Sequence, residues 1–334
     1  MIYKNVTVVV ILMLIFNVHS NLNAQTIDSL SQKTNLEIKK ISQTYNFENG
    51  DTRTYNKPKF LEIVTKLPKD FMDINRDFVA KDHAYYLGGS IAATALLVPF
   101  DQKITDQSRE FAERQGLSSA NKYGKFGPLA NIPQNIGAGF YLIGNGTTVI
   151  LMSAGFLTYG LLEKDYRAQA TASGLIESLA LSGVYVQTIK RITGRESPFI
   201  AIKNGNNGGD WNPFPSFSAY AKNTPSYDAV PSGHLTTIMS ALTVVITNYP
   251  EYKWIKPVGY SLVGAMCLQM MQSEVHWVSD YPIAVLVGYF VGKTIAKNRF
   301  TETKNIDGSE KKYSLNFSAS RNFGYNMVGA TIKF

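Results

Sequence analysis

The sequence predicts an all-α protein, in which six helices form a bundle between a charged N-terminal extension and a short C-terminal β-hairpin. Three observations support this fold class. Stretches with little or no charge follow one another through the middle of the 334-residue chain. Their length and their Leu, Ala, Met and Gly content favour helices over strands. The last residues alternate apolar and polar side chains, a pattern typical of a hairpin.

Residues 1–24 are typical of a secretory signal peptide. Lys4 precedes an apolar run at residues 6–16, and a polar stretch with the small residue Ala24 provides a cleavage point. The run is shorter than the about 20 residues that span a bilayer. A retained N-terminal anchor is the alternative interpretation. In both cases we expect an exported protein of the cell envelope, in the membrane or the periplasm.

Residues 25–82 form the predicted extension, which is polar and charged and has no clear core pattern. One or two surface helices are expected there. The character of the chain changes at residue 83, where the predicted main domain begins, and this domain extends to residue 298. Its six expected helices share a low charge: residues 85–100, 126–162, 168–189, 231–250, 257–273 and 281–292.

These six segments fit two environments. Some are long enough to cross a bilayer, which favours a membrane protein. Against this, Glu177 interrupts one segment, and the mean hydropathy of the chain is slightly negative, at −0.09. A helix that is apolar all round is equally typical of the buried core of a soluble protein. We expect membrane association, with the soluble bundle as the alternative.

Two further regions have a distinct composition. Residues 205–227 are rich in Asn, Gly, Pro, Ser and aromatics, which predicts a loop that either lines a substrate entrance or packs on the surface. The C-terminal tail, residues 299–334, contains alternating residues from 313 onward. Asn322, Phe323 and Gly324 form a turn signal within it, so a β-hairpin is predicted there.

The net charge and the cysteine content restrict the partners. A formal net charge of +8 indicates an anionic partner such as a lipid head group or a phosphate ester. No compact basic run alternates with aromatics, so nucleic acid is not expected. The single cysteine, Cys267, excludes an internal disulfide and most cysteine-based metal sites. No cofactor or metal is expected, and no protein partner is predicted.

Three short segments carry the candidate functional residues. They are residues 190–198 (KRITGRESP), residues 231–234 (PSGH) and residues 276–280 (HWVSD). Two of the four histidines of the chain lie in them, and histidine has an unperturbed pKa near neutrality, which suits proton transfer. The order of the segments, with an uncharged helix between the second and the third, favours a shared site.

Each segment taken alone also has a purely structural explanation. Lys190 and Arg195 are residue types that cap the C-terminus of a helix. Ser232 is an ordinary N-cap residue. His276 and Asp280 have the spacing of a structural i,i+4 pair on a helix.

The three segments together resemble the signature motifs of the type 2 phosphatidic acid phosphatase (PAP2) superfamily, which includes bacterial acid phosphatases and vanadium haloperoxidases. The family pattern is Lys, six residues, Arg-Pro; then Pro-Ser-Gly-His; then Ser-Arg, five residues, His, three residues, Asp. The second motif is complete here, and the resemblance covers residues 83–298. It implies a helical bundle with the site at one end, metal-independent hydrolysis and a phosphohistidine intermediate.

The resemblance also implies a role for each matching residue. His276 matches the nucleophile, and Asp280 the carboxylate that orients its imidazole. His234 matches the acid that protonates the leaving group and then activates water. The groups that would hold phosphate oxygens are Lys190, Ser232 and Gly233. The free amides of a helix N-terminus suit an anion on physical grounds as well.

The sequence departs from the family pattern at the two arginines. Ser197 stands where the first motif has arginine, and Gln269-Met270 replaces Ser-Arg in the third. Arg195, two residues before Ser197, is the candidate substitute for phosphate binding. Loss of one such charged donor typically lowers the rate by about 10² to 10³.

The sequence therefore predicts an exported phosphatase, slow or retuned, that acts on a phosphorylated lipid or a small phosphoester. A non-catalytic PAP2-like protein, which binds phospholipid or serves as an envelope scaffold, is the alternative that Ser197 and Met270 suggest. A haloperoxidase is a weaker alternative, because vanadate would need the missing positive groups.

Overall fold

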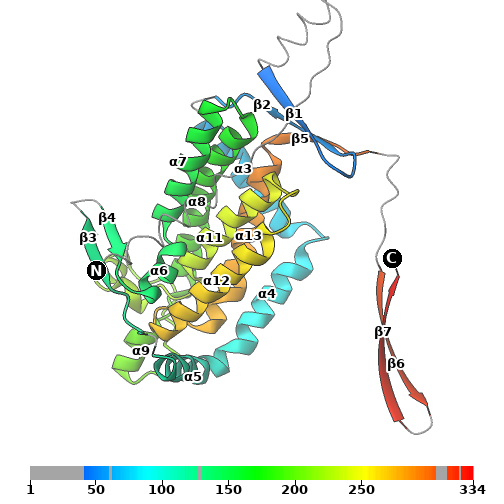
Figure 1. Cartoon of the computed structure of the whole chain (residues 1–334). Helices are drawn as coiled ribbons and strands as arrows, with labels where there is room; N and C mark the ends of the chain where they lie inside the picture. The colour runs from blue at the N-terminus through cyan, green and yellow to red at the C-terminus, as the bar shows by residue number, and fades with distance from the viewer. Residues whose placement is uncertain are drawn as a thin grey trace, which may run out of the picture. The chain divides into compact units, whose positions relative to one another are not determined.

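The computed structural model describes residues 41–59, 62–116, 118–126, 130–305, 314–322 and 325–333, so the predicted signal peptide lies outside the described residues. Helices dominate, as predicted, and Figure 1 shows their order. The helices are α3 (Glu62–Val79), α4 (Ala84–Leu97), α5 (Asp101–Arg114), α6 (Ile136–Ile143), α7 (Gly146–Leu162), α8 (Tyr166–Thr193), α9 (Pro198–Asn204), α10 (Phe217–Lys222), α11 (Gly233–Asn248), α12 (Ile255–Gln272) and α13 (Tyr281–Lys297).

All six predicted segments contain a long helix, but the one at residues 126–162 is broken. It holds part of the β-hairpin of β3 (Tyr123–Phe126) and β4 (Ala130–Pro133), followed by α6 and α7, which meet at 67°. The side chains of Asn135 and Asn145 accept hydrogen bonds from the first turns of α6 and α7 and start each helix anew. A continuous helix there was a wrong prediction, because these caps interrupt it.

The segment before α4 contains two β-strands as well as a helix, whereas only one or two surface helices were expected there. β1 (Ser42–Asn46) and β2 (Thr52–Asn56) pair antiparallel, and β2 pairs with β5 (Phe300–Thr303), which follows α13. Helix α3 packs on α8 and α13 through the fully buried Ile74. Residues 42–79 therefore belong to the same unit as the bundle.

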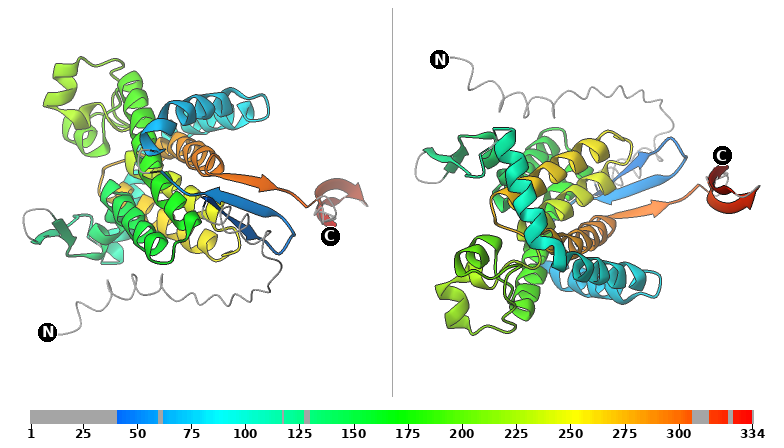
Figure 2. Two further views of the ribbon diagram at one scale, coloured as in Figure 1. Left: turned by 90° about the horizontal axis from the view of Figure 1, so that it is seen from above. Right: turned by 90° about the horizontal axis from the view of Figure 1, so that it is seen from below.

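Helices α8, α11 and α13 pack against one another and form the centre of the bundle (Figures 1 and 2). α11 and α13 approach at Gly288, where a Cβ would lie 2.6 Å from the Cβ of Met239 and 2.7 Å from the carbonyl oxygen of Thr236. This contact leaves no room for a side chain. It brings the N-terminus of α11 and the segment before α13, both predicted site segments, to the same end of the bundle.

Gly288→Ala is expected to lower the free energy of unfolding by about 1–3 kcal/mol, because the two helices would have to separate. Gly183→Ala on α8 is the matched control. A Cβ at Gly183 would meet no heavy atom within 4 Å, and alanine is favoured over glycine in a helix by up to about 1 kcal/mol. Urea unfolding of both variants measures the difference, and equal effects would contradict the close packing.

The remaining predictions concern Glu177, the loop and the tail. Glu177 is fully buried in α8, where it pairs with Arg299 at the end of α13. Residues 205–227 are mostly irregular, as predicted, apart from α10 and a 3-10 turn at Thr224–Ser226. The C-terminal hairpin is confirmed: β6 (Ser314–Asn322) pairs antiparallel with β7 (Tyr325–Lys333).

Across the described part of the chain, no helix by itself combines the length and the apolar composition needed to cross a bilayer; the bent pair α6 and α7 meets both requirements only when taken together. Helices α7 and α12 nevertheless carry large apolar side chains on their exposed faces. These include Ile150, Leu151, Leu161, Leu162, Val258 and Leu268.

Candidate functional site

His276 and Asp280 form a buried pair between α12 and α13. A 3-10 turn (Val278–Asp280) places the carboxylate so that Oδ2 accepts a hydrogen bond from Nδ1 of His276 at 3.2 Å and one from the backbone N–H of Trp277 at 2.8 Å. A carboxylate only accepts, so Nδ1 carries the proton. Nε2 of His276 is then left with a free lone pair, the state that a nucleophile requires.

Arg195 holds the other oxygen of Asp280. Its Nη1 donates to Oδ1 of Asp280 at 3.1 Å and to Oγ of Ser279 at 2.6 Å, while Nη2 donates to Asp101 Oδ2 at 2.6 Å and to the carbonyl of Gly208 at 2.7 Å. The side chain is fully buried. This geometry does not support the predicted role of Arg195 as a ligand of phosphate oxygens, because both terminal nitrogens are already occupied by protein oxygens.

Asp101, at the start of α5, is a site residue that the sequence interpretation missed. Its carboxylate accepts the backbone N–H of Ser279 at 3.0 Å and the Ser279 hydroxyl at 2.5 Å, besides the ion pair with Arg195. Burial raises the pKa of Asp101, and Arg195 opposes that shift. Nothing in the sequence distinguished this carboxylate from the others in a charged helix.

The Pro-Ser-Gly-His turn joins the pair directly. The backbone N–H of Ser232 donates to the carbonyl of Asp280 at 3.3 Å, and the Ser232 hydroxyl caps α11 by accepting from the N–H of Leu235 at 3.4 Å. A Cβ on Gly233 would lie 3.9 Å from Nζ of Lys190, at the end of α8. The three sequence segments therefore meet at the N-terminus of α11, whose free amides favour an anion.

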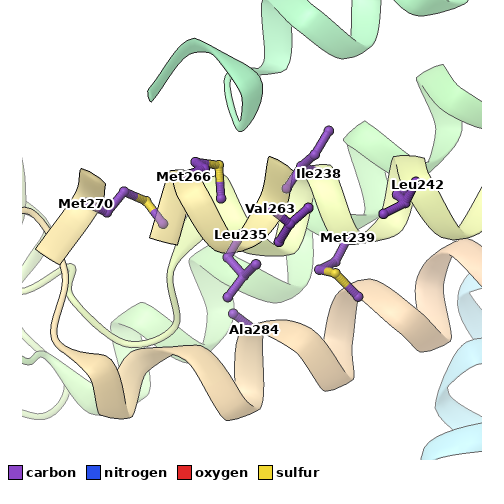
Figure 3. Close-up of a cluster of buried hydrophobic side chains, with 8 residues drawn as sticks. All are labelled: Leu235, Ile238, Met239, Leu242, Val263, Met266, Met270 and Ala284. Carbon is purple, nitrogen blue, oxygen red and sulfur yellow. The ribbon is translucent and has the colours of Figure 1, made fainter. Parts of the chain in front are cut away.

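Met270 occupies the position where the third motif has arginine. Its sulfur lies 3.7 Å from Oγ of Ser232. The side chain is fully buried in an apolar cluster with Leu235, Met266 and other residues of α11, α12 and α13, drawn in Figure 3. On this side the site is therefore apolar, where the family pattern would supply a guanidinium.

Lys190 is paired with a carboxylate that the sequence interpretation did not identify. Its Nζ lies 3.2 Å from Oδ2 of Asp228, and the hydroxyl of Ser197 donates to Oδ1 of the same side chain at 3.3 Å. Ser197 is the second position from which the family's arginine is missing. An aspartate thus lies between the two residues of the first motif.

His234 lies in the first turn of α11, near enough to His276 and Lys190 for both to influence its pKa, and its ring packs against Tyr141 with 4.3 Å between the ring centroids. Burial lowers the pKa of His234 to about 3, with smaller contributions from His276 and Lys190. His234 is therefore neutral at neutral pH when the site is empty. In that state it can accept a proton but cannot donate one.

The free energy of unfolding is expected to fall as the pH drops from about 6.5 to about 3. In this window His234 binds a proton in the unfolded chain, where its ordinary value of 6.5 applies, but not in the folded protein. His234→Gln should remove this part of the acid sensitivity, measured by urea unfolding across the pH range. His83→Gln, at a histidine outside the site, is the control, and identical pH profiles for the two variants would contradict the burial of His234.

Residues 171–304 match the model of the PAP2 superfamily. Over these residues the chain is similar to the PAP2 superfamily. The matched PAP2 region runs from α8 to β5 and contains all three motif segments. PAP2 proteins are generally phosphoesterases that act on phosphorylated lipids or small phosphoesters. The curated proteins and the solved structures compared with the chain gave no match.

Among the residues whose placement the structure describes, no three His, Cys, Asp or Glu side chains are arranged to hold a metal ion. The three motif segments bring together two imidazoles, one ammonium, one hydroxyl and the amides of a helix N-terminus, beside the carboxylates of Asp228 and Asp280. These groups suit phosphoryl transfer through a protein nucleophile.

Proposed function

We propose that this protein is an exported phosphatase that hydrolyses a phosphomonoester or a lipid (pyro)phosphate through a phosphohistidine at His276. The observation that carries the proposal is the hydrogen bond from Nδ1 of His276 to Asp280, beside the N-terminus of α11. It fixes the tautomer in which Nε2 is the nucleophile. The PAP2 match over the same residues supports the reaction class.

In the first step, the lone pair of Nε2 of His276 attacks phosphorus and the ester P–O bond breaks. The leaving oxygen takes a proton from protonated His234, and Asp280 stabilises the positive charge on the His276 ring. In the second step, water attacks phosphorus and the P–N bond breaks, so that its electron pair returns to Nε2. Neutral His234 takes the proton of that water, and phosphate leaves.

With its low pKa, His234 could not donate a proton in the first step. The two steps therefore require that a bound phosphate raise the pKa of His234. A phosphate monoester has a second pKa of about 6 and brings negative charge next to the ring. A nearby negative charge favours the protonated imidazole and so raises the pKa of His234. Substrate binding therefore prepares the acid. Because both motif arginines are absent, we expect a slow enzyme. Each uncompensated donor should lower kcat by about 10² to 10³-fold.

We further propose that the protein acts at a membrane of the cell envelope. The exposed apolar side chains of α7 and α12 form faces that suit lipid, and the net charge of +8 suits anionic head groups. The apolar run at residues 6–16 supports export. Co-sedimentation of the purified chain with anionic vesicles tests this part, and recovery in the supernatant at every lipid composition would contradict it.

The function itself is tested by phosphate release from a panel of lipid phosphates, lipid pyrophosphates and soluble phosphoesters. We expect the full chain to release phosphate from at least one of them, and His276→Asn to release none. Release that persists unchanged in His276→Asn would contradict the mechanism. Absence of release from every ester would contradict the enzyme assignment.

A non-catalytic phospholipid-binding protein is the second candidate, and one observation favours it. Lys190, the ammonium expected to bind phosphate, is already neutralised by Asp228, and Met270 fills the place of an arginine. This candidate predicts saturable binding of phosphorylated lipid with no phosphate release. The same ester panel, read for binding and for turnover, separates the two functions.

A further inference from the structure

Asp228 is held in place by the backbone of the first motif. The backbones of Asp228 and Arg195 form an isolated parallel β-bridge. The N–H of Ala229 donates to the carbonyl of Arg195 at 3.0 Å. Because of this pairing, the segment before the Pro-Ser-Gly-His turn lies next to the segment that follows α8. It directs the carboxylate of Asp228 to Lys190 and Ser197.

The contacts of Asp228 are those expected of a bound phosphate. One oxygen pairs with the ammonium of Lys190 at 3.2 Å and the other accepts the Ser197 hydroxyl at 3.3 Å. These are the first-motif positions at which the family pattern has Lys and Arg. The side chain of Lys190 is 8% exposed and that of Asp228 is 25% exposed, so the lysine is buried while the aspartate paired with it is partly open to solvent.

The contacts of Asp228 determine how much positive charge the empty site offers to a ligand. Within the site, the ammonium of Lys190 is balanced by Asp228, and His234 is neutral when the site is empty. A phosphoryl group can use Lys190 only by displacing Asp228 or by lying next to it. The repulsion from the carboxylate grows with the negative charge of the ligand.

We propose that Asp228 is the specificity-determining residue of the site, an internal counter-ion that competes with the phosphoryl group for Lys190. The carboxylate therefore weakens the binding of a phosphoryl group with two negative charges more than the binding of one with a single negative charge. This inference rests on the proposed function, because it assumes that phosphate binds at Lys190.

The test is a binding measurement that does not depend on turnover. Inorganic phosphate, mostly doubly charged at mildly alkaline pH, and dimethyl phosphate, singly charged, are titrated into the full chain by calorimetry at one pH. We expect Asp228→Asn to bind inorganic phosphate about tenfold or more tightly than the wild type, the order expected when one nearby charge is removed. Its gain for dimethyl phosphate should be smaller.

Asp228→Glu keeps the charge and is the matched control, which should bind phosphate as weakly as the wild type. Lys190→Met combined with Asp228→Asn should lose the gain. Thermal unfolding of each variant checks that it is folded. Equal phosphate affinity in the wild type and Asp228→Asn would overturn the role of Asp228 and leave the phosphate site standing. Failure of every variant, Asp228→Asn included, to bind phosphate would overturn both this inference and the proposed function.

Discussion

Replacing His276 by Asn is expected to abolish phosphate release, with a loss in kcat of about 10⁴-fold or more, because the reaction loses its nucleophile. Asn is smaller than His, but its side-chain amide can still donate a hydrogen bond, so the contact with Asp280 and the fold should persist. Initial rates on the best ester of the panel measure the effect.

Asp280→Asn is the companion variant for this prediction. It keeps the shape of the side chain but removes the charge that stabilises the imidazolium and fixes the tautomer, so kcat should also fall, without loss of the nucleophile itself. Full activity in Asp280→Asn would mean that the pair seen at 3.2 Å has no catalytic role.

Replacing Arg195 by Met is expected to lower the free energy of unfolding by about 3–5 kcal/mol, because it leaves buried charges without a partner. Asp101 and Asp280 are both fully buried and are both paired with Arg195. Activity should fall as well, since Arg195 holds the carboxylate that orients His276. Urea unfolding and initial rates measure the two effects.

Arg191→Met is the control for Arg195→Met. Arg191 lies in the last turn of α8, and its guanidinium stacks on the rings of Phe217 and Tyr220. Loss of such a contact costs about 0.5–1 kcal/mol at an exposed site. Adding Asp101→Asn to Arg195→Met should restore part of the stability, because one unpaired charge is removed. Equal stability losses for the two arginine variants would contradict the buried network.

The helices could be predicted because their signal is local. Long uncharged stretches favour buried helices, and all six contain one. The hairpin at Ser314–Asn322 and Tyr325–Lys333 has the equally local signal of alternation. A shared site for the segments of Lys190, Ser232 and His276 is predicted from three motifs with a known order. The structure places neighbouring residues of these segments close together, since Ser232 N–H bonds to the carbonyl of Asp280 and Gly233 lies beside Lys190.

What could not be predicted depends on partners far away in the sequence. β2 pairs with β5, nearly 250 residues later, and its five residues are too polar to signal a strand alone. Nothing in the sequence marks Asp101 or Asp228 as a site residue, because only folding brings them to Arg195 and Lys190. The contacts of Arg195 could not be predicted for the same reason, because its carboxylate partners come from other segments.

Both departures from the family motifs leave less positive charge available to a phosphate. Met270 makes one side of the site apolar, and Asp228 neutralises Lys190 on the other. The residues that match the family's nucleophile and its orienting carboxylate are retained, together with the helix N-terminus. The proposed phosphoryl transfer therefore keeps the groups it needs, and we expect a reduced attraction for a highly charged phosphate.

The most direct test of phosphoryl transfer through His276 is to trap the phosphoenzyme in the His234→Gln variant, using an aryl phosphate whose leaving group needs no acid. Loss of His234 should slow the attack of water, so that the intermediate accumulates. Rapid quenching at alkaline pH followed by peptide mass spectrometry should find an acid-labile phosphoryl group on His276. Product formation without any phosphohistidine, or a phosphoryl group on another residue, would contradict the account.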